Sequence, residues 1–332
     1  TAIGYKALED YDDGDGNGHN TAVGSKSQFN ATTGEYNTSL GSQSVGSGVT
    51  TGDYNIAVGY QAGTAITSGY ENVFIGSKAG DALTTGGRNV AIGHAALSAE
   101  DTRGNNVAIG YAALNILNAG ADAYNTAVGY AAGSLVTTGV QNTLLGGLAG
   151  DAINEGNQNV AIGHAALSTN QEGDSNVAIG FEALYTLNPA DGNSYNTAVG
   201  TQAGKLMTTG VRNTIIGGLA GDALTTGNYN TAVGYAALSQ EDGHGANVAM
   251  GYASLATLNA GGDAFNTAVG YSAGGNMSTA IRNTVIGGLA GGAITTGGDN
   301  VSLGYNSLGS NTIGDSNVAI GKDSMSVNVA AD

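Results

Sequence analysis

The stretch "NTAVGYAAGSLVTTGVQ", residues 125–141, is followed directly by "NTLLGGLAGDAINEGNQ" (142–158) and "NVAIGHAALSTNQEGDS" (159–175). Each block has 17 residues, begins with Asn and has Gly four places later. Such blocks open at 18 asparagines from Asn20 to Asn317, and one more block, at Thr1, lacks its Asn. The step is 17 in most blocks and 18 to 20 in the others. A repeat this short predicts stacked structural units in place of an ordinary globular core.

The first residues of each block have the composition of a short β-strand. Asn is followed by Thr, Val or Ile, then mostly by Ala, then by an aliphatic residue and Gly. β-branched residues favour an extended backbone. A second short strand is expected around the recurring Ala, for example Ala132 or Ala166, before a "TTG" or acidic turn. Because one block cannot bury its own apolar face, we predict an all-β parallel β-solenoid of about 19 coils.

The invariant Asn and Gly are predicted to be structural. In a solenoid each residue stacks on its counterpart in the next coil, so an Asn amide can donate to one neighbour and accept from the other. Gly permits a bend, or a positive φ, where a Cβ would clash. The predicted ladder consists of Asn55, Asn72, Asn89, Asn106, Asn125, Asn142, Asn159, Asn176, Gly59, Gly76, Gly93 and Gly110.

Four successive blocks form a larger repeat, which we call the super-repeat. The residue eight places after Asn is Gly in two successive blocks and then, with one Met, Leu in two. The second block of each group has a larger residue two places after Asn, namely Phe74, Leu144, Ile215 or Val285. The residue five places after that Asn is small: Ser77, Gly147, Gly218 or Gly288. We interpret the pairing of large and small residues as volume compensation within a layer.

Both faces of the first strand are apolar, which predicts that one face packs inside the coil and the other against a second copy of the chain. The outer face is predicted to consist of Ala57, Phe74, Ala91, Ala108 and their counterparts. Soluble monomers rarely expose an apolar stripe of that length. We therefore expect a homotrimer or an end-to-end polymer. Residues 1–332 are expected to be a single solenoid domain, cut from a longer chain.

Composition excludes several classes of function. Gly accounts for 58 of 332 residues, with one Pro and no Cys, so there is no disulfide framework or thiolate metal site. The 26 acidic residues outnumber the 9 basic residues and give a net charge of −17, which disfavours nucleic acid and anionic membranes as partners. No apolar run is long enough to insert into a membrane.

The blocks "NVAIGHAAL", "NTAVGYQAG" and "NVAIGYAAL" resemble the head repeats of trimeric autotransporter adhesins. They look still closer to the "NTAxGYxAG…TTG" arrays of phage tail fibres and bacterial surface fibres. The resemblance implies a left-handed parallel β-roll, assembled as a homotrimer on an exterior surface. The coil is longer than the 14 or so residues typical of the adhesin head, which is a departure from that family.

Few residues suggest a chemical site. Asp13, Asp15 and Asn17 alternate with Gly as the oxygen ligands of a calcium loop do, but the Glu expected at position 12 of such a loop is replaced by Gly24. His94 and His164 stand five places after Asn, where other blocks have Tyr, so we interpret them as ring-packing residues with no role as catalytic bases. Calcium is the one cofactor that the pattern suggests.

We expect a structural fibre or adhesin segment, extracellular, on a cell surface or on a virion, that is not an enzyme. Its expected partners are other copies of the chain and a cell-surface glycan or protein receptor. One alternative is the subunit of a self-assembling extracellular filament. Another is an ice-binding solenoid, suggested by the "TTG" turns at Thr85, Thr138, Thr209 and Thr226, although Asn154-Glu155 and Gln171-Glu172 interrupt that pattern.

Overall fold

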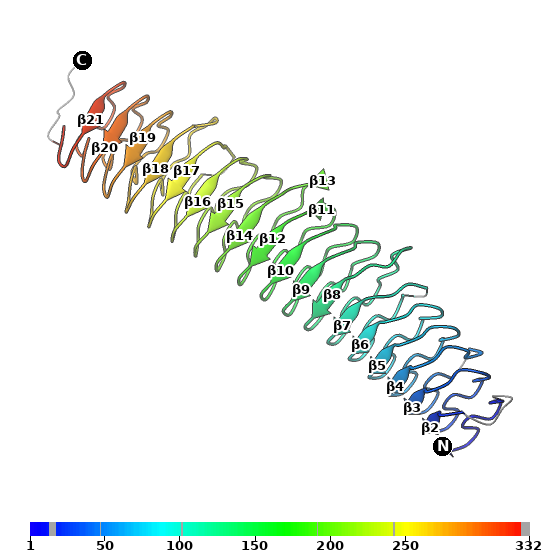
Figure 1. The fold of residues 1–332 in the computed structure, drawn as a ribbon. Coiled ribbons are helices and arrows are strands. Elements are labelled where there is room, and N and C mark those ends of the chain that lie inside the picture. The colour runs from blue at the N-terminus through cyan, green and yellow to red at the C-terminus, as the bar shows by residue number, and fades with distance from the viewer. Residues whose placement is uncertain (13–17, 47, 101, 191, 242, 327–332) are drawn as a thin grey trace. The chain divides into compact units, whose positions relative to one another are not determined.

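The computed structural model describes residues 1–12, 18–46, 48–100, 102–190, 192–241 and 243–326. The chain divides into two compact units, residues 1–164 and 165–332. Within the described residues there is no helix, and the regular elements are short β-strands connected by turns. The prediction of an all-β, parallel β-solenoid is confirmed, since each unit is a succession of coils whose strands pair in parallel (Figure 1).

The first unit contains ten strands, each of which pairs in parallel with a strand of a neighbouring coil in the unit. The strands are β1 (Ala2–Ile3), β2 (Thr21–Val23), β3 (Thr38–Leu40), β4 (Ile56–Val58), β5 (Val73–Ile75), β6 (Val90–Ile92), β7 (Val107–Ile109), β8 (Thr126–Val128), β9 (Thr143–Leu145) and β10 (Val160–Ile162).

The second unit repeats this arrangement with nine strands. They are β12 (Val177–Ile179), β14 (Thr197–Val199), β15 (Thr214–Ile216), β16 (Thr231–Val233), β17 (Val248–Met250), β18 (Thr267–Val269), β19 (Thr284–Ile286), β20 (Val301–Leu303) and β21 (Val318–Ile320). A separate two-stranded pairing joins β11 (Gly173–Asp174) to β13 (Gly192–Asn193) in two neighbouring turns.

Each three-residue strand begins one place after a block Asn, as the sequence predicts. The register is in phase: Val90 pairs with Val107, and Ile92 with Ile109. The backbone hydrogen bonds run between coils, for example from Val90 N to Asn106 O at 2.8 Å. A coil therefore satisfies its strand backbone only through its neighbours.

The predicted second strand is wrong. The segment around Ala132 consists of turns, in which Ala131 and Gly133 have φ of 52° and 58°. Around Ala166, both Ala165 and Leu167 have φ of 54°. An extended strand requires negative φ, so alternate left-handed residues cannot form one. These turn segments still join neighbouring coils by hydrogen bonds, as from Leu97 N to Ala113 O at 3.0 Å.

The predicted outer face of the strand is also wrong. Ala57, Phe74, Ala91 and Ala108 are fully buried and point into the coil. The outward positions are the residues on either side, such as Ile75, which is 38% exposed. Neighbouring strand residues point to opposite faces, and the narrow interior takes Ala at the middle position in most coils.

Volume compensation occurs, but at a different position from the predicted one. A Cβ built on Gly63 would lie 2.7 Å from Cδ2 of Phe74, and Phe74 also fills the space beside Gly80. The larger residue is therefore accommodated by the glycines eight places after Asn, in its own coil and the preceding coil. The position of Ser77 and Gly147 lies in an outward-facing column, where many of the other coils have exposed rings.

Candidate functional site

The predicted ladder asparagines form buried, hydrogen-bonded columns. The backbone N of Asn89 donates to Oδ1 of Asn72 at 2.9 Å, and Nδ2 of Asn72 donates to the carbonyl of Gly86, in its own coil, at 2.9 Å. One side chain thus closes its own coil and caps the next. The same pattern recurs between Asn142 and Asn125, at 2.9 Å. Because these groups are shielded from water, losing one amide would leave a buried N–H unpaired, at a cost of about 1–3 kcal/mol.

The ladder glycines adopt a backbone conformation that other residues avoid. Gly59, Gly76, Gly93 and Gly110 have φ between 129° and 139°. A Cβ on Gly59 would lie 2.5 Å from the carbonyl oxygen of Gly76 in the next coil. The requirement for Gly therefore comes from both the left-handed backbone and the close stacking of coils.

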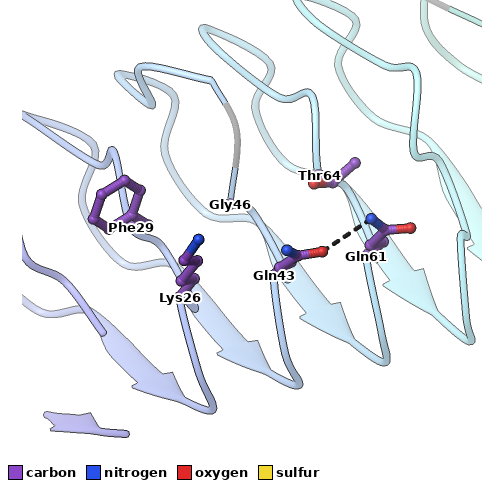
Figure 2. A pocket seen from close by; sticks show the side chains of 6 residues that line it. All are labelled: Lys26, Phe29, Gln43, Gly46, Gln61 and Thr64. Carbon is purple, nitrogen blue, oxygen red and sulfur yellow. Dashed lines mark hydrogen bonds between the residues drawn. The ribbon is translucent and has the colours of Figure 1, made fainter. Parts of the chain in front are cut away.

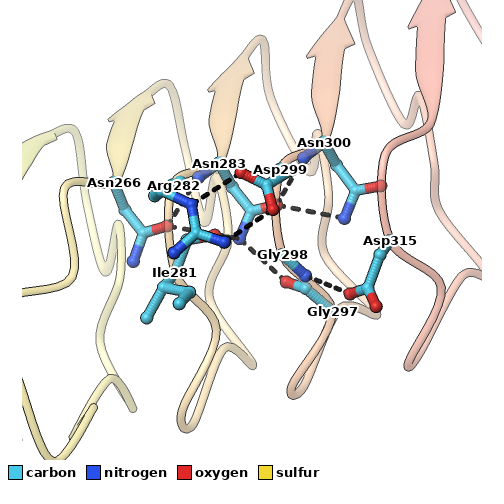
Figure 3. Close-up of polar contacts among 9 residues, drawn as sticks. All are labelled: Asn266, Ile281, Arg282, Asn283, Gly297, Gly298, Asp299, Asn300 and Asp315. Carbon is cyan, nitrogen blue, oxygen red and sulfur yellow. Dashed lines mark hydrogen bonds and ion pairs between the residues drawn. The ribbon is translucent and has the colours of Figure 1, made fainter.

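In the second unit the ladder runs beside an ion pair and a second surface carboxylate (Figure 3). Arg282, next to the ladder residue Asn283, makes two hydrogen bonds of 2.7 Å to the carboxylate of Asp299 in the next coil. Its guanidinium holds the pKa of the Asp299 carboxyl below its ordinary range. Gly298 N donates to Oδ1 of Asp315 at 2.6 Å. Exposed pairs of this kind connect coils but contribute little to stability.

His94 lies in an exposed column of stacked rings. Its centroid is 5.4 Å from that of Tyr111, which in turn is 5.4 Å from that of Tyr130, with interplanar angles of 10°. His164 is also exposed, and its Cδ2 would lie 3.6 Å from a Cβ placed on Gly147. Since Tyr and His occupy equivalent places in one surface column, the arrangement is that of a stacking surface.

The predicted calcium ligands Asp13, Asp15 and Asn17 lie outside the described residues. Among the residues that are described, no group of three or more His, Cys, Asp or Glu side chains is placed to hold a metal ion. The part of the chain that the structure describes also contains no helix of the length and hydropathy needed to cross a lipid bilayer.

One groove in the first unit combines charged, amide and aromatic groups (Figure 2). The pocket has a volume of about 330 Å³ and is lined by Lys26, Phe29, Gln43, Gly46, Gln61 and Thr64. We call it the lysine–glutamine groove. Its residues come from three successive coils and occupy two block positions, six and nine places after Asn. Regular stacking therefore places Lys26, Gln43 and Gln61 side by side in one row.

The row is polar and cationic in an acidic protein. Nε2 of Gln61 donates to Oε1 of Gln43 at 2.9 Å. Lys6, in the preceding coil, forms an ion pair of 2.9 Å with Glu9 and lies 5.2 Å from the centroid of the Phe29 ring. For Lys26, by contrast, the described residues provide no ion pair.

Sequence analysis did not identify this groove. A signal was present, because the residue six places after Asn, or after the missing Asn of the first block, is Lys or Gln in the first five blocks: Lys6, Lys26, Gln43, Gln61 and Lys78. In the next four blocks the same place holds only Ala or Leu. Such a short run is conspicuous only when it is known that this position faces outward.

A buried carboxyl group is the other unusual titratable feature. Glu241 is fully buried, and its Oε1 accepts a hydrogen bond from the backbone N of His244 at 3.2 Å. Burial raises the pKa of Glu241 above its ordinary value. The side chain closes a turn, and the geometry is that of a structural cap.

Comparison of the chain with protein-family models, with curated proteins and with solved structures found no significant match. Interpretation of function therefore depends on the geometry of the coils, the grooves and the exposed strand face.

Proposed function

We propose that the chain is a structural segment of an extracellular, cell-surface or virion fibre or adhesin, with no catalytic role. In this proposal the coils provide a regular scaffold, copies of the chain associate through one face, and turns and grooves are displayed for attachment. The stacked coils, the buried Asn ladder and the resemblance to fibre repeats support it. A homotrimer is favoured, and a linear polymer is the second choice.

The observation that carries the proposal is the character of the outward strand positions. From β2 to β10, and in β12 and β14 to β21, the first and third strand residues are only Thr, Val, Ile, Leu or Met. None of them is fully buried, whereas the middle residue is buried in each of these strands. In a chain with a net charge of −17, this face carries no charge, and its third positions are all aliphatic or Met. Such a face is suited to being covered by another copy.

The test is the mass of the chain in solution. Ile75 and Ile216 are 38% and 40% exposed, one in each unit, so Glu at either place should leave the coil intact. We expect the wild-type chain to sediment as a defined multimer, and Ile75→Glu with Ile216→Glu to shift it toward single chains, because a buried unpaired carboxylate is costly.

Thr85→Glu with Thr209→Glu is the matched control, since it adds the same two charges at exposed turns, one in each unit. The control should keep the wild-type mass, and circular dichroism should show an unchanged fold in all variants. A wild-type chain that sediments at the mass of one chain would overturn the proposed association.

Ice binding is less favoured by the geometry of the threonines. Of the threonines in question, the hydroxyl of Thr226 donates to the carbonyl of Gly243 at 3.2 Å, and that of Thr85 to the carbonyl of Thr102 at 3.4 Å. These hydroxyl groups join neighbouring coils, so they are not free to order a layer of water.

A further inference from the structure

We propose that the lysine–glutamine groove binds an acidic monosaccharide, with Lys26 holding its carboxylate and the glutamine amides its hydroxyl groups. The inference deepens the proposed attachment role, on which it rests, by naming a site and a ligand class. It depends on three features of the groove: an unpaired cation, a pair of linked amides and an aromatic wall.

The cation is available for a ligand. Lys6 is already paired with Glu9, whereas Lys26 is exposed and lies in the groove without an ion pair among the described residues. The charge acts locally, because ionic screening limits its reach to about 8 Å at physiological salt. A carboxylate seated beside Lys26 would gain a charge-assisted hydrogen bond.

The amides suit a sugar better than a simple anion. The bond from Gln61 to Gln43 uses one donor of the first and the acceptor of the second. It leaves the Nε2 group of Gln43 as a donor and Oε1 of Gln61 as an acceptor, without another hydrogen bond in the described structure. A donor and an acceptor in one row match neighbouring hydroxyl groups, each of which both donates and accepts.

The walls leave room for a ring. Phe29, Gly46 and Thr64 form one side of the groove, each nine places after its block Asn. Because Gly46, the middle residue, has no side chain, this side is open at its centre (Figure 2). Phe29 is the aromatic wall, and the weakly positive C–H face of a pyranose packs favourably against the negative face of such a ring. The volume of about 330 Å³ is at the lower end of the range for small-ligand sites.

Equivalent positions in the second unit differ in these groups. Where Gln202 and Lys205 occupy them, Lys205 is already paired with Glu182 at 2.7 Å. In the second unit the equivalent pocket, of about 200 Å³, is lined mainly by small or apolar residues, among them Ala253, Ala256 and Leu289. It has no charged side chain. The scaffold thus repeats the hollow, and the side chains of the first coils give it a chemical preference.

The experiment is calorimetric titration of the full chain with methyl β-glucuronide. Methyl β-glucoside is the uncharged control ligand, and acetate is the control for a carboxylate without a sugar. We expect saturable binding of the glucuronide only. Lys26→Gln should weaken binding by about 10- to 100-fold, the loss expected for a hydrogen bond to a charged group. Lys78→Gln removes a charge from the same row outside the pocket and should leave binding unchanged.

Phe29→Leu should weaken the glucuronide but not any residual acetate binding, which separates a sugar site from a simple anion site. Equal affinity for acetate and glucuronide, equal loss in both lysine variants, or no binding at all would each overturn the inference. Sedimentation of the same samples keeps the two proposals distinct. A multimer that binds no glucuronide contradicts only the groove, and a single chain that binds it contradicts only the association.

Discussion

At the residue scale, one buried position of the coil is occupied either by an aliphatic side chain or by a side chain that hydrogen-bonds within its own turn. Eleven places after Asn, the coil interior is usually aliphatic, as at Leu83 and Leu117. In the third block of each super-repeat this position holds Glu100, Asn170, Glu241 or Asn311. Asn170 both accepts from Gly173 N at 3.1 Å and donates to Gly173 O at 2.8 Å. An ionised glutamate at this position cannot donate a hydrogen bond to a carbonyl as the Asn170 amide does, whereas a protonated carboxyl group can.

Glu241 should make stability depend on pH. Burial raises its pKa from an ordinary value of 4.5, so the folded state binds more protons than the unfolded chain above that pH. Stability is therefore expected to fall as pH rises from about 4.5 through the raised value, and to level off above it. Urea denaturation from about pH 4 to about pH 7 measures this slope, and Glu241→Asn should reduce it.

The control is Glu71→Gln, which removes an exposed carboxylate paired with Arg88 at 2.9 Å and should leave the slope in place. Some slope should persist in the Asn variant, because burial also raises the pKa of Asp222. An unchanged slope in Glu241→Asn would mean that Glu241 does not carry the effect.

At the element scale, a coil contains two kinds of segment that stack equally well. The strand is extended, and the following segment alternates between left-handed and other conformations, as at Ala112 and Leu114, with φ of 54° and 47°. Both donate backbone hydrogen bonds to neighbouring coils, which offsets the cost of left-handed residues.

The strained segment predicts that Gly is favourable where it would normally destabilise. Ala112→Gly should raise the free energy of unfolding by up to about 1 kcal/mol, because the left-handed penalty of a Cβ is removed. Ala108→Gly, in the middle of β7, should instead lower it by about 0.5–1 kcal/mol. Chemical denaturation of the two variants gives the comparison, and equal destabilisation of both would argue against strain at Ala112.

At the scale of the whole molecule, charge and the exposed apolar face act in opposite directions on association. The net charge of −17 repels copies from one another, while the uncharged strand positions favour contact. Half-buried ion pairs such as Lys205 to Glu182, at 2.7 Å, lie within one unit and cannot join copies while they stay paired.

Salt should therefore strengthen association. Raising ionic strength from about 10 mM to about 150 mM shortens the screening length from about 30 Å to about 8 Å and weakens the repulsion between acidic copies. Sedimentation velocity at the two concentrations should show a shift toward the multimer at higher salt. Dissociation by salt would instead indicate that ion pairs hold the copies together.

The repeat by itself determined the coil, its length and the place of the strand that follows each Asn. Asn and Gly recur because each has a local requirement that stacking repeats in every coil: an amide that must be bonded, and a backbone that excludes a Cβ. Periodicity reports such requirements directly, so the ladder and the parallel register were readable from Asn55 to Asn176.

Only the tertiary structure shows which side chains face the interior and which residues of different coils lie next to one another. A strand that is apolar on both faces does not reveal its orientation, so Phe74 was assigned to the wrong side. A left-handed segment looks like a strand when only residue types are read, as at Ala132. The lysine–glutamine groove joins residues from three coils, and stacking alone brings Lys26, Gln43 and Gln61 together. Sequence specifies each coil locally, but a surface site is a property of neighbouring coils and depends on which positions point outward.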